Sequence, residues 1–456
     1  MTMDINTRIE LSNETIKNNT VPGQAGKVGL IGAFPSINQD VHAYTNLANL
    51  RADYGIVANS GSEKNFDGAV AAKRIFMDGI EDYDGASSIT TVNICDEKLD
   101  TSKISVQVND GSESTEDNEN GANAIVNTDK ATLLSYSKLR TALTKLADED
   151  IDLLFISADI NNAIPKTGDV LYDGTKLEKD GSIDNVLDLI LYYLNKIYST
   201  KKPCNWIYWM NCVTGATEGQ ETEGIGSKII NVKEAVRQAE YIAQHDTTNL
   251  ATAGLYYQPG YIRKSTYGTS QTVGRMEIAA HMTGFTASLP VTQSLTNQTI
   301  PGITGVTEEA YFGEKDAGGL LMNAGIQVIK PNDRLNGTYC VKNSIQPNFF
   351  DVNHIRAVTY LLKQYNLIDT IGEETYDINI EALKAQLEAI NKDVLATVPV
   401  IKEITVGNHK ILSPWKIYIP INIKLYGTID VIKIGVNMEI VDESNATEVT
   451  STIVVS

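Results

Sequence analysis

The chain has 456 residues, a formal net charge of -19 at pH 7 and a sequence pI of about 4.7. This length predicts two or three domains, and the apolar fraction is sufficient for a sizeable core. The acidic balance argues against nucleic-acid binding and against docking on anionic lipid as the main function, because both require a cationic surface.

The first residues predict an extended arm. Ile5, Thr7, Ile9 and Leu11 alternate with polar residues, which is the period-two pattern of a β-strand. The polar residues 12–26 that follow show no periodicity. We therefore expect a strand at the end of a tether, with no partner strand nearby in the sequence.

From residue 27 to about residue 330 the pattern predicts an α/β fold with a mainly parallel or mixed sheet. Short apolar or β-branched runs alternate with amphipathic stretches, as in βαβ units. Buried strands are expected at 28–34, 88–95, 152–157, 205–210 and 251–257. Helices are expected at 66–77, 132–147, 183–198, 232–245 and 275–283.

Beyond residue 331 the pattern changes to α+β. Helices are expected at 352–365 and 380–394, the second with a narrow apolar stripe suited to packing on a partner. Segments 415–425 and 429–441 flank a turn-like triplet and predict an antiparallel hairpin with each other. A polar break at 442–447 then precedes a last strand, with Val449, Ile453 and Val455 on one face.

The sequence contains no recognisable signature of an enzyme or of a metal site. It lacks the dinucleotide and phosphate-binding glycine motifs, the HExxH motif and the nucleophile elbow. The acidic residues 110–121 do not follow the spacing of a calcium loop, so we interpret them as a solvated loop. We expect no catalytic residue, no cofactor and no metal ligand.

Two features leave alternatives open. Asp159 follows a predicted strand, where open α/β sheets place catalytic groups, although it is equally an ordinary loop residue or helix cap. The cysteines, Cys95, Cys204, Cys212 and Cys340, form no CxxC pair, which predicts buried free thiols. We see no signal peptide and no membrane span, and expect synthesis in a reducing cytoplasm.

The two predicted terminal strands can be interpreted in two ways. They can fold back on their own domain or fray, or they can add to the sheets of neighbouring subunits. Repeated head to tail, such an addition does not close and produces a filament.

Several motifs, in this order and spacing, resemble the contractile tail sheath protein family of phage-type tails. The segment 28–35 (VGLIGAFP) with 50–55 (LRADYG) is similar to the opening of sheath proteins, although the usual Gly-Pro pair is missing. The segment 67–79 resembles their helix before an Asn/Asp-Gly turn. Segments 279–296 (AAHMTGFTASLPVTQSLT) and 316–326 resemble a characteristic internal region, and 352–367 resembles a C-terminal helix.

The resemblance implies a domain organisation along the chain. Residues 1–26 would be the N-terminal arm and tether, and 442–456 the C-terminal tether and arm strand. The sheath core would comprise 27–95 and 271–330, with an inserted α/β region at 96–270 that matches no family motif. Residues 331–441 would be the C-terminal α+β sheath domain.

The resemblance also implies a function. Sheath subunits form a helical polymer around a tail tube, with their arms joined by β-strand addition, and contract to drive the tube through a cell envelope. The implied partners are other copies of the chain, the tail tube protein, and the baseplate and tail terminator proteins. The implied location is a virion tail assembled in the host cytoplasm.

Lys384 and Lys392 on the second C-terminal helix are candidates for facing the tube. They can be interpreted equally well as ordinary solvent-facing lysines. A soluble α/β hydrolase-like enzyme using Asp159 and another non-enzymatic assembly component remain the alternative interpretations.

Overall fold

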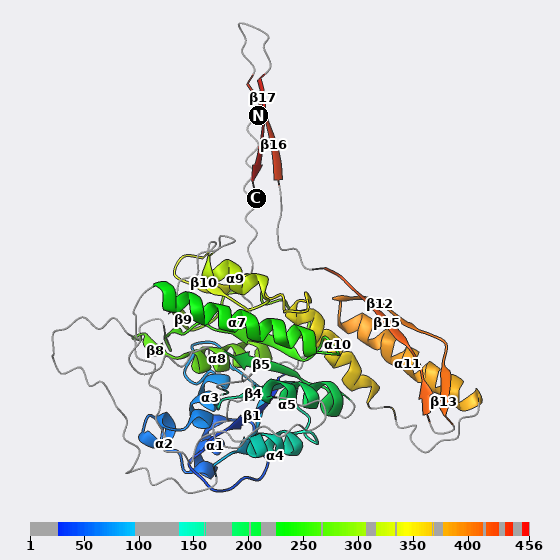
Figure 1. The fold of residues 1–456 in the computed structure, drawn as a ribbon, viewed down its shortest axis with the longest axis horizontal. Coiled ribbons are helices and arrows are strands. Elements are labelled where there is room, and N and C mark those ends of the chain that lie inside the picture. The colour runs from blue at the N-terminus through cyan, green and yellow to red at the C-terminus, as the bar shows by residue number, and fades with distance from the viewer. Residues whose placement is uncertain are drawn as a thin grey trace, which may run out of the picture.

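A computed structural model of the chain shows a central α/β body, a C-terminal helix-and-strand unit beside it, and a hairpin that stands away from both (Figure 1). The residues that the structure describes are 26–95, 136–158, 160, 185–199, 202–210, 225–265, 268–306, 316–332, 335–366, 368, 377–413, 416–427, 434–440 and 449–455. Statements about absences below refer to these residues.

The body is built on a six-stranded mixed sheet in the order β2-β3-β1-β4-β5-β6. Five strands run parallel, and β2 pairs antiparallel with β3 at one edge. Their bounds are β1 Lys27–Gly32, β2 His42–Tyr44, β3 Ser88–Asn93, β4 Leu153–Ile156, β5 Asn205–Trp209 and β6 Thr252–Tyr256. The prediction of a mainly parallel or mixed sheet is confirmed. β1 lies inside the sheet, with β3 and β2 on one side of it and β4, β5 and β6 on the other.

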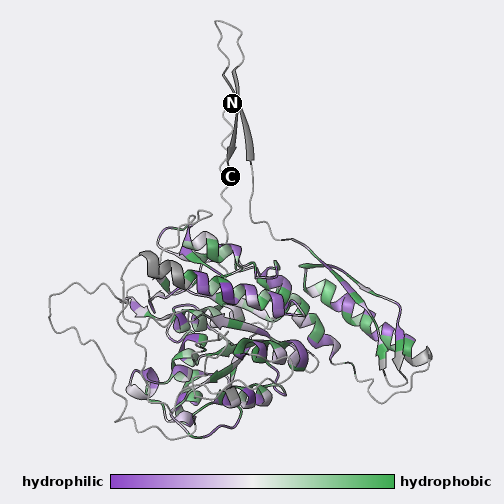
Figure 2. Cartoon of the chain, in the orientation of Figure 1, coloured by the Kyte–Doolittle hydropathy of each residue, from purple (hydrophilic) through white to green (hydrophobic). Residues whose placement is uncertain are grey.

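Helices cover both faces of this sheet, which explains why its strands are apolar without interruption. On one face α3 (Asp67–Ile75) packs on β1 and on α8 (Arg275–Ser288), and α8 extends over β4, β5 and β6. On the other face α4 (Tyr136–Leu146) packs on β1 and β3, followed by α5 (Val186–Tyr192) and α7 (Ile225–His245). Hydrophobic residues are concentrated on the central strands and on the inner sides of the helices (Figure 2).

Smaller elements complete the body. The helices α1 Leu47–Tyr54, α2 Gly61–Lys64 and α9 Ala317–Asn323 are short, and a π-helical turn, η3 Tyr193–Tyr198, continues α5. A three-stranded sheet contains β7 Gly260–Ile262, β8 Gln271–Val273 and β9 Ile303–Val306. A two-stranded sheet contains β10 Ile329–Pro331 and β11 Tyr339–Val341. None of these strands was predicted from the sequence.

The C-terminal unit has its own small core. It comprises α10 Val352–Tyr365, α11 Asp377–Thr397, β12 Ile401–Val406, β13 Lys410–Ser413, β14 Lys416–Tyr418 and β15 Ile421–Leu425. Ala357 and Leu361 of α10 pack with Val394 of α11, with Val398 directly after α11, and with Ile401 of β12. The predicted α+β character of this region and both of its predicted helices are confirmed.

The predicted pairing of residues 415–425 with 429–441 is wrong. Pro420 interrupts the first segment, so that β14 pairs with β13 while β15 pairs with β12. In the second segment, β16 (Ile434–Ile440) pairs with β17 (Val449–Val455). Alternation identifies a strand and its apolar face, but it carries no information on which neighbour supplies the hydrogen bonds.

The predicted boundary at residues 95 and 96 does not coincide with a break in the sheet. β1 and β3 come from the segment 27–95, whereas β4, β5 and β6 come from the segment 96–270, and all five belong to one sheet. Their buried side chains form one hydrophobic cluster. The division of the chain into core and insertion therefore stays a prediction.

Candidate assembly surfaces

The C-terminal hairpin is the first candidate surface, because each of its strands has an open edge. β16 and β17 form a two-stranded sheet, so among the described residues neither strand has a second neighbour. The register sets apolar residues opposite each other, namely Ile434 with Val455, Val436 with Ile453, and Ile440 with Val449. The predicted residues Val449, Ile453 and Val455 therefore occupy equivalent positions along one side of the hairpin.

Such a hairpin is incomplete as a folded unit. An isolated two-stranded sheet is marginally stable in water, and a third strand or a covering layer is required for independent stability. Unpaired N–H and C=O groups along a strand edge also form a template for another strand. The arrangement is therefore chemically suited to β-strand addition, whichever chain supplies the strand.

Several predicted residues lie outside the described part of the chain. These are the N-terminal arm residues Ile5, Thr7, Ile9 and Leu11, both tethers, the acidic loop 110–121, and Asp159. Their roles stay predictions.

The exposed side of α11 is the second candidate surface, and it is not basic. The Lys384 side chain is largely covered and forms an ion pair with Glu381 at 3.0 Å. Lys392 is exposed, and Glu388 and Asp393 lie exposed on the same helix. Asp and Glu side chains outnumber lysines on this helix. This excess of negative charge is not apparent when the lysines alone are considered.

A buried polar joint holds α10 against the body. The Nζ atom of Lys363 donates to Asp152 Oδ1 at 2.5 Å, to Ile151 O at 2.7 Å and to Asp150 Oδ1 at 3.1 Å. Burial alone would lower the pKa of Lys363, but the neighbouring carboxylates of Asp152 and Asp150 raise it. Lys27 also forms an ion pair with Asp150.

Further contacts of α10 extend this joint. The fully buried guanidinium of Arg356 donates to Leu289 O at 2.8 Å. Thr359 accepts a hydrogen bond from Asn205 of β5 at 2.8 Å. Nε2 of His354 donates to Tyr426 O at 2.7 Å, since Nδ1 accepts from the backbone of Asp351. One helix thus connects the sheet with the C-terminal unit.

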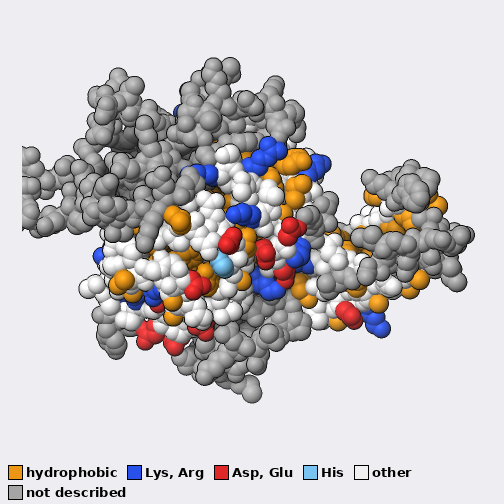
Figure 3. Space-filling model, turned by 90° about the horizontal axis from the view of Figure 1, so that it is seen from below, with side chains coloured by type: hydrophobic (Ala, Val, Ile, Leu, Met, Phe, Trp, Pro, Cys, Tyr) orange, Lys and Arg blue, Asp and Glu red, His pale blue; other side chains and the backbone are white. Residues whose placement is uncertain are grey.

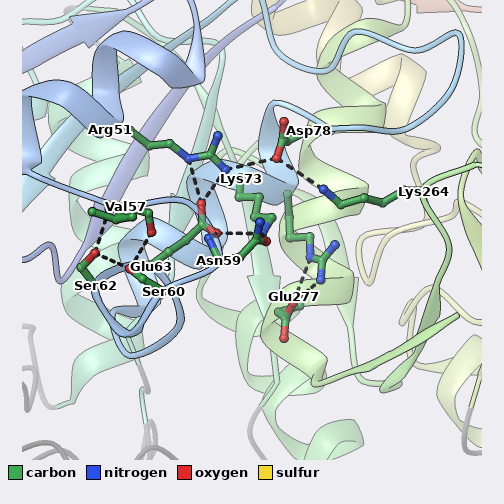
Figure 4. A network of polar contacts seen from close by, with 11 residues as sticks. Arg51, Val57, Asn59, Ser60, Ser62, Glu63, Lys73, Asp78, Lys264 and Glu277 are labelled. Carbon is green, nitrogen blue, oxygen red and sulfur yellow. Dashed lines mark hydrogen bonds and ion pairs between the residues drawn. The ribbon is translucent and has the colours of Figure 1, made fainter. Parts of the chain in front are cut away.

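A second polar network fixes the helices before β3 (Figure 4). Glu63 is 2% exposed and pairs with Arg51 at 2.5 Å and with Lys73 at 2.8 Å. Asp78 binds the same arginine at 3.1 Å and lies 3.5 Å from Lys264. Although burial raises the pKa of Glu63, hydrogen bonds from Lys73, from a backbone amide and from Arg51 lower it overall. These mutually neutralising groups form a clamp between α1, α2, α3 and the loop after β7.

The carboxyl edge of the sheet, where α/β folds bind ligands, is partly closed by the chain itself. Asn93 Oδ1 accepts from the backbone of Phe34 and of Cys95, each at 3.0 Å. Asp67 Oδ1 accepts from Ala33 N at 2.6 Å. A small recess of about 90 Å³ lies beside this edge, lined by Val92, Ile94 and neighbouring residues of α4.

The remaining chemical predictions can be tested only in part. Cys95, Cys204 and Cys340 are buried thiols outside any disulfide, as predicted, and burial raises the pKa of Cys204 to about 12. Cys212 lies outside the described residues. Within the described ranges no cluster of three or more His, Cys, Asp or Glu residues has the arrangement of a metal site. Nor does any described helix have the length and apolarity required to cross a membrane.

The underside of the molecule carries interspersed charges of both signs (Figure 3). Lys and Arg side chains lie among Asp and Glu, with scattered hydrophobic side chains between them. This face is therefore unlike the continuous basic surface that nucleic-acid binding requires.

No family model matches the chain, and no curated protein matches it. Among solved structures, it is similar to the helical sheath of the anti-feeding prophage in its contracted state, at 12% identity and a TM-score of 0.49. That likeness covers 95% of this chain and 98% of the other. The sheath tail protein of Desulfitobacterium hafniense is 12% identical, with a TM-score of 0.48 and coverage of 95% and 97%. That of Listeria innocua is 10% identical, with a TM-score of 0.45 and coverage of 95% of both chains.

These similar structures are tail sheath proteins, the family that the sequence motifs resemble.

Proposed function

We propose that this chain is the structural subunit of a contractile tail sheath, which polymerises helically around a tail tube. The observation that carries the proposal is the C-terminal hairpin with an open edge on each strand. The alternating N-terminal residues 5–11 supply a candidate third strand, and the ordered sheath-like motifs favour the same interpretation.

In this proposal the arms of neighbouring subunits join by β-strand addition. The N-terminal strand of one subunit adds to the open edge of the β16–β17 hairpin of another, because main-chain hydrogen bonds complete an otherwise marginal sheet. The contact is heterologous, so its repetition extends the polymer without closing it. The tail tube protein, the baseplate and the tail terminator are the further partners, in a virion tail assembled in the host cytoplasm.

Contraction would then be a change of packing between subunits that consumes no nucleotide. The polar tethers at 12–26 and 442–447 would act as the joints. The Glu63 clamp and the Lys363 joint support this view, because both stiffen the subunit internally. A stiff body on jointed arms transmits a change in lattice geometry to the tube, and drives it through the target cell envelope to allow genome ejection.

The proposal is tested by removing one arm at a time. Variants lacking residues 1–11 or residues 448–456 are expected to fold as monomers with an unchanged helical signal in far-UV circular dichroism, and to form no tubes. The full chain, examined by negative-stain electron microscopy alone and with tube protein added, is the control. Tubes of normal appearance from either truncated variant would reject arm exchange.

A further inference from the structure

The residues just before α10 form a tight hairpin with an unfavourable backbone conformation at its tip. Ile345 and Asp351 form an antiparallel bridge, and Gln346 N donates to Phe350 O at 2.8 Å. Phe349 N donates back to Gln346 O at 2.8 Å. The loop thus has three residues, and its last, Phe349, has a φ of 67°. In such loops this position takes the left-handed conformation that glycine or asparagine adopts readily and a bulky side chain does not.

The phenylalanine gains no burial within its own chain in return. The side chain of Phe349 is 85% exposed, and that of Phe350 is 41% exposed. Among the described large hydrophobic residues, Phe349 is the most exposed. An aromatic residue that is both strained and exposed is unfavourable for the isolated subunit, and such outliers concentrate at functional sites.

The base of the hairpin is fixed, so the conformation is not a result of loose packing. Gln346 is fully buried. The side chain of Asn348 donates to Asn249 O at 2.6 Å, which ties the loop to the turn before β6. Pro347 packs directly on Gly325, which has a φ of 77°. A Cβ atom at position 325 would lie only 2.2 Å from Pro347 N, so only glycine fits there. The body therefore presents Phe349 on a rigid support.

The two phenylalanines end an uncharged stretch that is followed by the buried Asp351, in a chain in which 21% of residues are charged. Residues 343–350 contain no charged residue, and neither do residues 247–250, which contact them through Asn249. An aromatic centre with an uncharged polar rim is typical of the core of a protein interface, where charges are depleted.

We propose that Phe349, with Phe350 beside it, is an anchor that contacts a second copy of this chain in the polymer, independently of the terminal arms. A second copy is the partner that fits an uncharged aromatic loop on a strongly acidic chain. At a net charge of -19, two copies repel each other at long range, so a contact between them requires short-range apolar attraction rather than ion pairs. The inference rests on the proposed polymerisation and adds a contact on the body to the one made by the arms.

The test separates the subunit's own stability from its assembly. Phe349→Asn keeps a residue that tolerates the left-handed conformation and removes the ring, whereas Phe349→Tyr keeps the ring. Val57→Asn is the matched control, because Val57 is 65% exposed and does not itself have a positive φ. The critical concentration for tube formation is measured by sedimentation and electron microscopy, and monomer stability by urea denaturation in dilute solution.

We expect Phe349→Asn to raise the critical concentration at least about tenfold, while the monomer is as stable as the wild type or more so. Phe349→Tyr and Val57→Asn are expected to assemble normally. Phe349→Asn that assembles like the wild type would overturn the inference, and so would a destabilised monomer, which indicates a purely structural role. If Phe349→Asn assembles normally by itself but fails to assemble around added tube protein, the anchor contacts the tube. That result would overturn the proposed contact between copies of this chain. Wild-type protein that never assembles would reject the proposed function together with this inference.

Discussion

Replacement of Lys363 by methionine removes the ammonium group from the joint between α10 and the sheet. The Lys363 side chain is 14% exposed and that of Asp152 is 16% exposed, so this pair is largely shielded from water, whereas Asp150 is 51% exposed. Removing one partner of a fully buried pair costs about 3–5 kcal/mol, because the other charge is left uncompensated. Here one carboxylate is half exposed and Lys27 still contacts it. We therefore expect a loss of about 2 kcal/mol in the free energy of unfolding.

The loss is measured by urea denaturation of the monomer, followed by far-UV circular dichroism at 0.1 M and 1 M salt. Since a shielded pair is screened little by salt, the loss is expected to be similar at both concentrations. The matched control is Lys424→Met, which breaks a pair with Glu403 of the same kind at 2.8 Å. Both of its side chains are exposed, at 64% and 42%, so the expected loss is below about 0.5 kcal/mol.

A double variant tests the assignment of the effect to the charge pair. Asp152→Asn removes the charge that Lys363→Met leaves behind, so the double variant is expected to lose less than the sum of the two single variants. Equal losses for Lys363→Met and Lys424→Met, or additive losses in the double variant, would refute the reasoning that burial gives this joint its strength.

The remaining predictions concern the core. Gly32→Ala is expected to destabilise the fold by about 3 kcal/mol or more, because its new Cβ would lie 2.7 Å from Gly68 Cα. Gly274→Ala, which meets nothing within 4 Å, is the control and is expected to cost a few tenths of a kcal/mol in the same denaturation assay. Burial and the nearby charge of Arg74 lower the pKa of His281 to about 4, despite its hydrogen bond to Pro301 O. Because the unfolded chain binds this proton near pH 6.5, the contribution of His281 to stability is fully present above pH 6.5. It declines by about 1.4 kcal/mol per unit as the pH falls toward 4. The urea midpoint of His281→Gln is therefore expected to depend less on pH between 6.5 and 4.5, and an unchanged slope would contradict this assignment.

The sequence alone located the main elements of the body. All five predicted buried strands and all five predicted helices of residues 27–283 are present, with shifted ends. Each of them has a local signal, since a strand buried on both faces is a short apolar run and a covered helix repeats every three to four residues. The strands of three residues, such as β7 and β8, were missed because so few residues hold no periodic pattern.

Pairing and the polar sites were decided only by the tertiary structure. The segment 415–425 has the alternation of one strand, yet Pro420 divides it between two partners, β12 and β13, that precede it in the chain. Lys363 and Asp152 are separated by 211 residues, and nothing in either neighbourhood marks them as partners. In the sequence, Phe349 cannot be distinguished from an ordinary apolar residue. Only the structure gives its positive φ and its high exposure. Periodicity records which side of an element faces the core, and this information is local. Strand partners, buried ion pairs and backbone strain depend on residues that only folding brings together, so the sequence predicted the elements and the tertiary structure determined the surfaces.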